Sequence, residues 1–295
     1  VLFRSFRELN SVEDTAYDAA NSKLSAIMRG YYKDPYIEYF VPNNVAQLPP
    51  MNLGYFARCQ IMLQAVLKFH KIHGDGIQVV ILGCGYDTLF WRLRDMNVNV
   101  KGWYDLDLEF VVKRKGPIVA GNSIFAPLDN YYLIECDLSK ENTVKECLLK
   151  SNFDENAPTI FVDECSLIYV DPFAVDKIIC YAGQLKESAF ISYGMIKPND
   201  QFGKMMVQNF QSFGAPLKGI NQYPTIQSYV ERFQKCGYKK VKACDMDKAM
   251  KLILTPEDFM RVRKLEIQDD PEELSYMLSH YILAIASTER SEERR

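Results

Sequence analysis

Residues 78–92 have the composition and spacing that indicate chemistry most directly in this chain. The apolar run from Val79 to Leu82 is typical of a strand buried on both faces of a parallel sheet. It leads directly into Gly83 and Gly85, and two such glycines let the backbone turn tightly and approach a ligand where a Cβ atom would obstruct it. The segment therefore predicts a strand, a glycine turn and a helix that hold a nucleotide-type cofactor, and a turn without a ligand is the alternative.

Two acidic residues follow at the distance that such a cofactor requires. Asp105 and Asp107 end the next apolar stretch, about 20 residues beyond the glycines, where a carboxylate can accept hydrogen bonds from ribose hydroxyls. A dinucleotide fold places a third glycine where this chain has Thr88, and bulk at that point disfavours a pyrophosphate. The chain also lacks an obvious proton-relay histidine. An adenosyl cofactor is therefore favoured, and an NAD-dependent dehydrogenase is the weaker alternative.

The overall composition limits the class of protein. With 295 residues, of which 48% are hydrophobic, the chain can bury a large core within one domain. A net charge of −3 provides no field for nucleic-acid binding, and the basic triplet at 113–115 is interpreted as a solvated helix end. No stretch reaches the roughly 18 consecutive apolar residues of a membrane span, and no leader opens the chain. We expect a soluble, cytoplasmic monomer without nucleic-acid or membrane partners.

The cysteines and histidines predict neither disulfides nor a metal site. The eight cysteines form no close pairs in the sequence and several lie in apolar segments, so they are predicted to be reduced and buried. His70 and His73 lie three residues apart without an accompanying acidic or cysteine partner, and no metal is expected there. Cys84 and Cys165 have no nearby histidine and are expected to be inert packing residues rather than nucleophiles.

From residue 78 onward, strand and helix patterns alternate with short connections, which predicts a right-handed βαβ series. The predicted strands are 78–83, 100–106, 131–136, 159–163 and 189–195. The predicted helices are 86–96, 107–115, 140–151 and 171–187. Two further β-rich runs, from Lys239 to Cys244 and from Tyr281 to Ser287, are expected to pair at the sheet edge. The fold class is therefore α/β, with a doubly wound, mostly parallel, seven-stranded Rossmann-like sheet.

Segments outside the sheet are predicted to be helical. Ser11 and Asp14 form a plausible capping box for a helix through Met28, and the stretch 55–70 is typical of a second helix. An aromatic and methionine stripe after the fifth strand is interpreted as core or lid packing. The single domain is divided into an N-terminal helical lid (1–76), a cofactor-binding core (77–196), a helical insertion (197–238), and C-terminal strands and helices (239–295) with a frayed tail from Thr288.

Several separated motifs in this chain resemble the leucine carboxyl methyltransferase family. That family is a branch of the S-adenosylmethionine-dependent methyltransferases with a doubly wound sheet. The similarity runs in constant order from about residue 15 to residue 287 and implies a class I methyltransferase fold with S-adenosyl-L-methionine as cofactor. The matching segments are KDPYI at 33–37, GYFAR at 54–58, LGCGYDT at 82–88 with FWRL at 90–93, DLD at 105–107, DL at 137–138 and ECSLIY at 164–169.

The resemblance implies roles for individual residues in holding the cofactor. Asp107 would hold the ribose hydroxyls, Asp137 would accept a hydrogen bond from the adenine amino group, and the Leu138 backbone N–H would donate to a ring nitrogen. Arg58 would clamp the methionyl carboxylate bidentately, with Lys23 as a second positive charge. The full predicted cofactor site consists of Lys23, Arg58, Gly83, Gly85, Asp107, Asp137, Leu138 and Glu164.

Three of the predicted residues, namely Arg58, Glu164 and Tyr169, are expected to lie near the reacting groups. Glu164 would face the positive end of the cofactor, and Tyr169 is either part of the acceptor site or a core tyrosine. Arg58 and Tyr169 are the predicted catalytic residues. The chain departs from the family pattern in two places. The segment from Gly116 to Asn130 is shorter than expected, and Asp163 adds a charge beside Glu164, so the pocket rim is expected to differ.

The acceptor that the family implies is the C-terminal leucine carboxylate of the catalytic subunit of type 2A protein phosphatases. Such a carboxylate has an ordinary pKa of about 3.3–3.7, so it is ionised at neutral pH and needs no general base. The enzyme must dehydrate it and align it with the sulfonium methyl group for direct in-line transfer.

Other functions remain as alternatives. They are a small-molecule O-methyltransferase of the same fold and a non-catalytic scaffold that binds the phosphatase, which the combination of Arg58, Asp107 and Glu164 disfavours. Relatives that act on a modified guanosine in transfer RNA usually carry a large C-terminal repeat domain. The non-basic charge and the lack of such an extension in this sequence disfavour that function.

Overall fold

The computed structural model describes residues 12–41 and 45–288. Seven strands form one sheet in the order β3-β2-β1-β4-β5-β7-β6, and the first five of these are mutually parallel. The predicted α/β fold with a mostly parallel, seven-stranded sheet is therefore confirmed. The strands are β1 (Gln78–Leu82), β2 (Gly102–Asp107), β3 (Tyr131–Glu135), β4 (Thr159–Glu164), β5 (Ser188–Met195), β6 (Lys240–Asp245) and β7 (Tyr281–Ser287).

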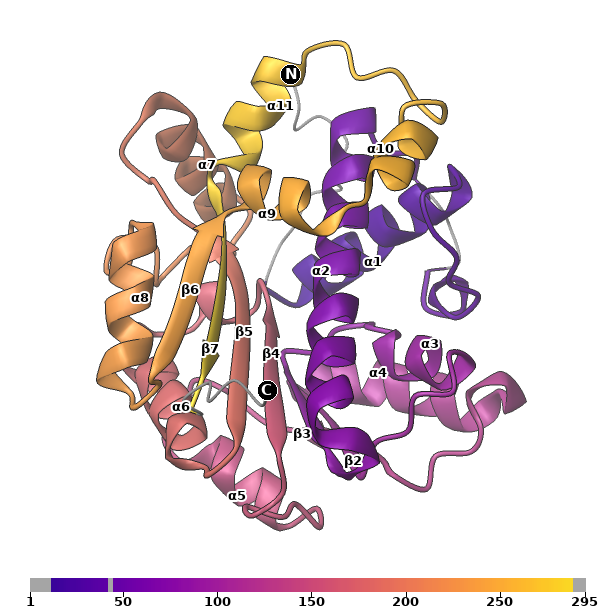
Figure 1. Ribbon diagram of the computed structural model, residues 1–295, viewed down its shortest axis with the longest axis vertical. Helices are drawn as coiled ribbons and strands as arrows, with labels where there is room; N and C mark the ends of the chain where they lie inside the picture. The colour runs from indigo at the N-terminus through magenta and orange to yellow at the C-terminus, as the bar shows by residue number, and fades with distance from the viewer. Residues whose placement is uncertain (1–11, 42–44, 289–295) are drawn as a thin grey trace, which may run out of the picture.

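Helices cover both faces of this sheet (Figure 1). They are α1 (Val12–Met28), α2 (Pro49–His73), α3 (Leu89–Asp95), α4 (Glu109–Gly121), α5 (Thr143–Leu149), α6 (Pro172–Gln184), α7 (Gln201–Ser212), α8 (Ile226–Lys235), α9 (Met246–Ile253), α10 (Pro256–Val262) and α11 (Pro271–Leu278). The apolar residues of α2, α3 and α4 form one core with one side of the strands. Those of α5, α6 and α8 form a second core with the other side.

The central strands owe their form to burial on both faces. Every residue of β1 is buried, and β5 is buried along its whole length. Alternate side chains enter opposite cores, since Val79 and Ile81 belong to one core and Val80 and Leu82 to the other. The unbroken apolar runs that predicted these strands are therefore the consequence of a sheet sandwiched between two helical layers.

The two strands at one edge of the sheet confirm the predicted pairing of the last β-rich runs. Strand β7 lies between β5 and β6 and is antiparallel to both. Figure 1 shows α9, α10 and α11, which connect β6 to β7, gathered at one end of the sheet beside α1 and α2. Side-chain caps begin each of these three connecting helices, with Asp245 on α9, Thr255 on α10 and Asp270 on α11.

The helices that a minimal sheet domain would lack lie either on a face of the sheet or at its end. Helix α2 is longer than predicted and packs against β4 and β5, so it forms part of the helical layer on the sheet. The predicted insertion consists of two helices, of which α7 lies at the end of the sheet and α8 covers a face of it. The Ser11 cap and the tail 289–295 lie outside the described residues. Thr288, the predicted start of the frayed tail, is instead buried, and its backbone N–H donates to the Ser188 carbonyl. Within the described part of the chain, no helix is both long and apolar enough to cross a membrane.

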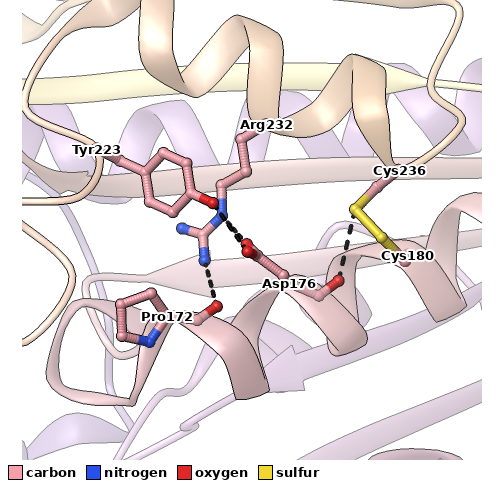
Figure 2. The surroundings of a disulfide bond; sticks show 6 residues. All are labelled: Pro172, Asp176, Cys180, Tyr223, Arg232 and Cys236. Carbon is pink, nitrogen blue, oxygen red and sulfur yellow. Dashed lines mark hydrogen bonds and ion pairs between the residues drawn. A yellow bond between two sulfur atoms is a disulfide. The ribbon is translucent and has the colours of Figure 1, made fainter.

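The prediction that all eight cysteines are reduced is wrong for one pair. Cys180 on α6 and Cys236 just after α8 form a disulfide, which Figure 2 shows together with its surroundings. The two residues are 56 positions apart in the sequence, so their spacing gives no sign of the pairing. They meet because α6 and α8 pack side by side on one face of the sheet. The other cysteines are free, and Cys147 and Cys244 are only half-buried.

Candidate active site

A cavity of about 470 Å³ opens at the carboxyl ends of the parallel strands, within the usual volume range of ligand pockets. Chain segments that leave β1, β2, β3 and β4 line it, as expected for a binding site in an open α/β sheet. Helix α1 and the start of α2 close it from the side. Every residue of the predicted site lines this one cavity: Lys23, Arg58, Gly83, Gly85, Asp107, Asp137, Leu138, Glu164 and Tyr169.

The glycine turn after β1 brings three chain segments together. Gly83 and Gly85 have φ angles of 71° and 48°, which favour glycine. A Cβ atom on Gly83 would lie 2.4 Å from Cβ of Ser166, and one on Gly85 would lie 3.3 Å from Cβ of Ala16 on α1. The two glycines therefore also let the loop after β4 and helix α1 approach the turn, a role that the sequence analysis did not predict.

Asp107 ends β2 and is held directly against the glycine turn. Its Oδ2 atom accepts a hydrogen bond of 2.6 Å from the Gly85 N–H, and its Oδ1 atom accepts one of 2.7 Å from the Leu108 N–H. Burial raises the pKa of Asp107, although these two N–H donors oppose that rise. The carboxylate is thus fixed at the cavity wall by the backbone of the turn itself.

Asp105 is not a binding residue, although it was predicted as a possible partner of ribose. It is 1% exposed and forms a 2.7 Å ion pair with Lys115 on α4. The basic triplet was predicted to be a solvated helix end, and this is wrong for Lys115, because α4 continues to Gly121 and turns this residue toward the sheet. Burial opposes the charge, but Asp105 together with Cys84 and Asp87 outweighs burial and raises the pKa of Lys115. The pair is a buried support beneath the glycine turn.

Lys23 and Arg58 meet at Glu164, the last residue of β4. Lys23 Nζ lies 3.0 Å from the Glu164 carboxylate and 3.2 Å from Asp87 Oδ2. Arg58 Nε donates to Glu164 Oε1 at 2.6 Å, and Arg58 Nη2 donates to the Glu164 backbone carbonyl at 2.9 Å. These four side chains form a buried network of two positive and two negative charges. The two leading helices therefore place their cations at the glycine turn and not in bulk solvent.

The charges of this network support one another. Burial alone would lower the pKa of Lys23 and of Arg58, but the nearby groups that favour a positive charge, with Glu164 as the strongest, together outweigh burial and raise both pKa values. Burial would raise the pKa of Asp87, but Lys23 and then Lys115 lower it. All three groups therefore keep their charges at neutral pH.

Sequence reasoning missed several residues that complete this network. Asp87 lies inside a quoted motif, yet nothing in the sequence indicated its contact with Lys23. The Arg58 guanidinium lies over the rings of Tyr55 and Tyr193, 5.1 Å and 5.0 Å from their centroids. Tyr193 in turn stacks on Tyr281 at 5.6 Å. Only the pairing of β5 with β7 brings these two tyrosines together, so a sequence pattern could not reveal them.

The segment after β3 carries the two remaining predicted residues. Asp137 Oδ1 accepts hydrogen bonds from the backbone N–H and the hydroxyl of Ser139, at 3.0 Å and 2.6 Å. Partial burial opposes ionisation, but these donors lower the pKa of Asp137. The side chain of Leu138 is buried in the core below the cavity.

Asp163 does not alter the cavity rim, contrary to expectation. It is 2% exposed and accepts hydrogen bonds from the backbone N–H groups of Ser166 and Leu167 and from the Ser192 hydroxyl. Burial raises its pKa, which those donors counteract. Asp163 therefore fixes the loop after β4 from beneath.

The expectation that Cys84 and Cys165 are inert agrees with their surroundings. Burial raises the pKa of the Cys84 thiol well above its ordinary value and that of Cys165 to about 12. Both thiols are therefore protonated at neutral pH and unsuited to nucleophilic attack.

We call Lys23, Arg58, Asp87, Asp107 and Glu164 the charged half of the cavity. The opposite lining, which we call the apolar half, comes from the segment after β4, from the end of β5, and from α7, α11 and β7. Tyr169 is buried and packs against Phe210 of α7 with ring centroids 6.1 Å apart. Among the described residues, the Tyr169 hydroxyl has no hydrogen-bond partner, so it is available to a ligand. The apolar half consists of Tyr169, Val170, Met195, Phe202, Phe210, Met277, Leu278 and Tyr281.

His70 and His73 do have acidic neighbours, contrary to expectation. His70 Nε2 lies 2.7 Å from Asp75, and His73 Nδ1 lies 3.5 Å from Glu187. Asp75 follows α2 immediately, and Glu187 precedes β5, so packing of α2 on the sheet creates the second contact. Across the described residues, no group of three or more His, Cys, Asp or Glu side chains could hold a metal ion.

Comparison with known proteins connects this geometry to one family. A family model described as "Leucine carboxyl methyltransferase" matches residues 11–182, which include the whole charged half. The chain belongs to the leucine carboxyl methyltransferase family. It is 30% identical to leucine carboxyl methyltransferase 1 of Caenorhabditis elegans over 94% of this chain and 91% of that protein. It is 28% identical to leucine carboxyl methyltransferase 1 of Bos taurus over 95% of this chain and 91% of that protein.

One solved structure agrees in fold, and a further relative is similar in sequence. A crystal structure of a DUF574-family protein from Streptomyces avermitilis has a TM-score of 0.59 at 13% identity and covers 91% of this chain and 97% of that one. The tRNA wybutosine-synthesizing protein 4 of Homo sapiens is 28% identical over 95% of this chain but only 44% of its own length. Family membership and fold together show that the protein is a methyltransferase.

Proposed function

We propose that this protein uses S-adenosyl-L-methionine to esterify the C-terminal leucine α-carboxylate of the protein phosphatase 2A catalytic subunit. The observation that carries the proposal is the division of one cavity into a charged half at the glycine turn and an apolar half opposite. The names of the C. elegans and bovine relatives support a leucine carboxylate as acceptor. The phosphatase itself is the expectation that the sequence motifs raised.

The charged half fits the donor electrostatically. S-adenosyl-L-methionine supplies a methyl group on a positively charged sulfonium. Among the described residues, the cavity lining contains more carboxylates than cations, and a cationic molecule is favoured in such a site. Asp107 stands at the end of the second strand, where a carboxylate binds ribose hydroxyls in this class of fold.

The cation pair is suited to the amino-acid end of the donor. Arg58 donates one N–H from Nε and one from Nη2 to Glu164, which leaves both N–H groups of Nη1 and one of Nη2 for a carboxylate. Glu164 offers its carboxylate to an ammonium group. Asp137 and the Leu138 backbone N–H supply an acceptor and a donor for an adenine edge. We retain these roles, and Tyr169 as an acceptor-side residue, as predictions.

The apolar half is suited to stripping water from a leucine side chain and its carboxylate. In the proposed reaction the carboxylate oxygen forms a bond to the methyl carbon while the carbon–sulfur bond breaks in line. The sulfur keeps the electron pair, and no proton moves. The acceptor is already ionised, so none of these residues needs to act as a general base.

The partner and setting of the protein are also part of the proposal. We propose that it acts as a cytoplasmic monomer, and gel filtration and cell fractionation test this. The similarity to the wybutosine-synthesizing protein raises a transfer RNA substrate, which the net charge of −3 disfavours. A small-molecule acceptor and a non-catalytic scaffold are the remaining alternatives.

One transfer experiment separates these functions. The protein is incubated with methyl-labelled S-adenosyl-L-methionine and phosphatase catalytic subunit, either intact or lacking its last residue. We expect label on the intact subunit only, and release of the label by mild base, because a methyl ester hydrolyses. Equal labelling of both forms would contradict a terminal carboxylate acceptor. Labelling of transfer RNA or small acids alone would identify an alternative substrate.

A further inference from the structure

Lys218 stands apart from the other cations of the cavity. Three basic side chains line it among the described residues, and two of them, Lys23 and Arg58, are already bound to Glu164. Lys218 is exposed, and its ammonium has no hydrogen-bond or ion-pair partner in the described part of the chain. An unpaired cation at the edge of an apolar half is a place where an incoming anion can bind.

The backbone around Lys218 is held in place. The neighbouring residues Leu217 and Ile220 are buried. The Gly219 N–H donates to the carbonyl of Ile168 at 3.2 Å, and Ile168 directly precedes Tyr169. Lys218 is therefore carried beside the short helical turn that bears Tyr169, and it belongs to the apolar half by position.

The far end of this loop is also anchored, as Figure 2 shows. The Tyr223 hydroxyl donates to Asp176 Oδ2 at 2.8 Å, and Arg232 Nε donates to Asp176 Oδ1 at 2.7 Å. The Arg232 guanidinium lies 4.0 Å from the centroid of the Tyr223 ring. These contacts attach the loop to α6, one helical turn from the disulfide at Cys180. The loop is thus built to hold a fixed position.

The excess of carboxylates in the cavity lining explains why an unpaired cation would help to bind an anionic acceptor. The carboxylates that line the cavity repel an anionic acceptor, and the cations of the charged half bind Glu164 and, in the proposed function, the carboxylate of the donor. An acceptor carboxylate therefore needs a separate positive group on the apolar side. The lining carboxylates are those of Asp18, Asp87, Asp107, Asp137 and Glu164.

We propose that Lys218 binds a carboxylate of the acceptor and thereby determines the preference for an anionic acceptor. This inference rests on the proposed function and assigns an acceptor-binding residue to it. The carboxylate has two possible sources in a peptide, namely the terminal α-carboxylate and an acidic side chain upstream of it. Lys218 binds the acceptor without taking part in the charged half, so donor binding is independent of it.

The test compares four proteins: wild type, Lys218→Gln, Lys218→Arg and the control Lys204→Gln. Lys204 is an exposed lysine of α7 that does not line the cavity. Two peptides end in leucine with a free carboxylate, and one of them also carries aspartates upstream. We expect Lys218→Gln to raise the KM for peptide about three- to tenfold while kcat and the KM for the donor stay unchanged. Lys218→Arg and Lys204→Gln are expected to resemble wild type.

The outcomes distinguish the possibilities. A raised KM for both peptides identifies the terminal carboxylate as the bound group, and a raised KM for the aspartate peptide alone identifies the side chains. A wild-type KM for both peptides in Lys218→Gln would overturn the inference and leave the proposed function intact. If wild type methylates neither peptide nor the intact phosphatase subunit, the proposed function fails, and this inference fails with it.

Discussion

The charged half and the apolar half of the cavity are built in opposite ways. In the charged half, Lys23 and Arg58 on the leading helices both bind Glu164 at the end of β4, at 3.0 Å and 2.6 Å. On the apolar side, the Tyr169 hydroxyl and the ammonium of the adjacent Lys218 have no hydrogen-bond or ion-pair partner among the described residues. The charged half is therefore held in place by its own ion pairs, whereas the apolar side offers a hydroxyl and an ammonium group that a ligand can bind. Such a difference suits the proposed function, in which the charged half always binds the same donor and the apolar half binds the acceptor.

The largest expected effect comes from breaking the charged half at Glu164. Glu164→Gln would leave Lys23 and Arg58 buried with one carboxylate fewer, and loss of one partner in a buried ion pair costs about 3–5 kcal/mol. We expect a lower free energy of unfolding in urea and little remaining methyl transfer. The exposed pair of Glu155 with Lys145 is the control, since Glu155→Gln should cost no more than about 1 kcal/mol. Equal stability of Glu164→Gln and Glu155→Gln would show that the network is not structural.

The disulfide tests whether the apolar half depends on its anchor. Replacement of Cys180 and Cys236 by serine removes a cross-link across 56 residues and should lower the free energy of unfolding by about 2–4 kcal/mol. Because the loop with Lys218 is attached to the same helix α6, the KM for acceptor should rise while donor affinity stays unchanged. The matched control is Cys244→Ser, a free and half-buried cysteine. If the double variant had wild-type stability and a wild-type KM for acceptor, the disulfide would not be what holds the apolar half in place.

Tyr169 tests whether the apolar half takes part in the reaction. Its hydroxyl has no described partner, so Tyr169→Phe removes no internal hydrogen bond and should leave the melting temperature unchanged. If the hydroxyl binds the acceptor, kcat/KM for acceptor should fall about tenfold, the value of one hydrogen bond to a charged group. Unchanged kinetics would assign Tyr169 to the core alone.

The smallest expected effect is that of pH: the rate of methyl transfer should hardly change between about pH 6 and pH 9. Glu164 raises the pKa of Lys23, and Lys23 lowers that of Asp87 against the effect of burial, so both keep their charge from about pH 6 to pH 9. The stabilisation from Lys23 is fully present below the ordinary lysine pKa and is lost as the pH rises through the higher folded value. That from Asp87 is present above the ordinary aspartate pKa and is lost as the pH falls through the lower folded value. A steep bell-shaped profile in single-turnover experiments would contradict the absence of acid–base catalysis.

The sequence could predict the charged half because its residues follow strands in recognisable motifs. Gly83, Asp107 and Glu164 each stand at the end of an apolar run, and parallel strands bring their carboxyl ends to one edge. The positions of the five central strands along the chain and the pairing of the last two β-rich runs also followed from periodicity. The residues on the leading helices could be placed at this edge only through resemblance to a family, because Lys23 and Arg58 alone look like surface charges.

Other features depend on contacts that periodicity cannot reveal. Lys115 appears in a basic triplet, and only the extension of α4 turns it inward to Asp105. The Cys180 disulfide and the position of Lys218 arise from the packing of α6, α8 and the loop that connects α7 to α8. In each case the sequence identifies the residue type, while the facing partner comes from a different part of the chain.

The division of the cavity into two halves is tested most directly by titration calorimetry with S-adenosylhomocysteine. The measurement compares wild type with Asp107→Asn and Lys218→Gln, after thermal unfolding has shown that all three are folded. We predict that Asp107→Asn weakens binding tenfold or more, about the value of one hydrogen bond to a charged group, and that Lys218→Gln binds like wild type. Unchanged affinity in Asp107→Asn, or a comparable loss in Lys218→Gln, would contradict the assignment of donor and acceptor to separate halves.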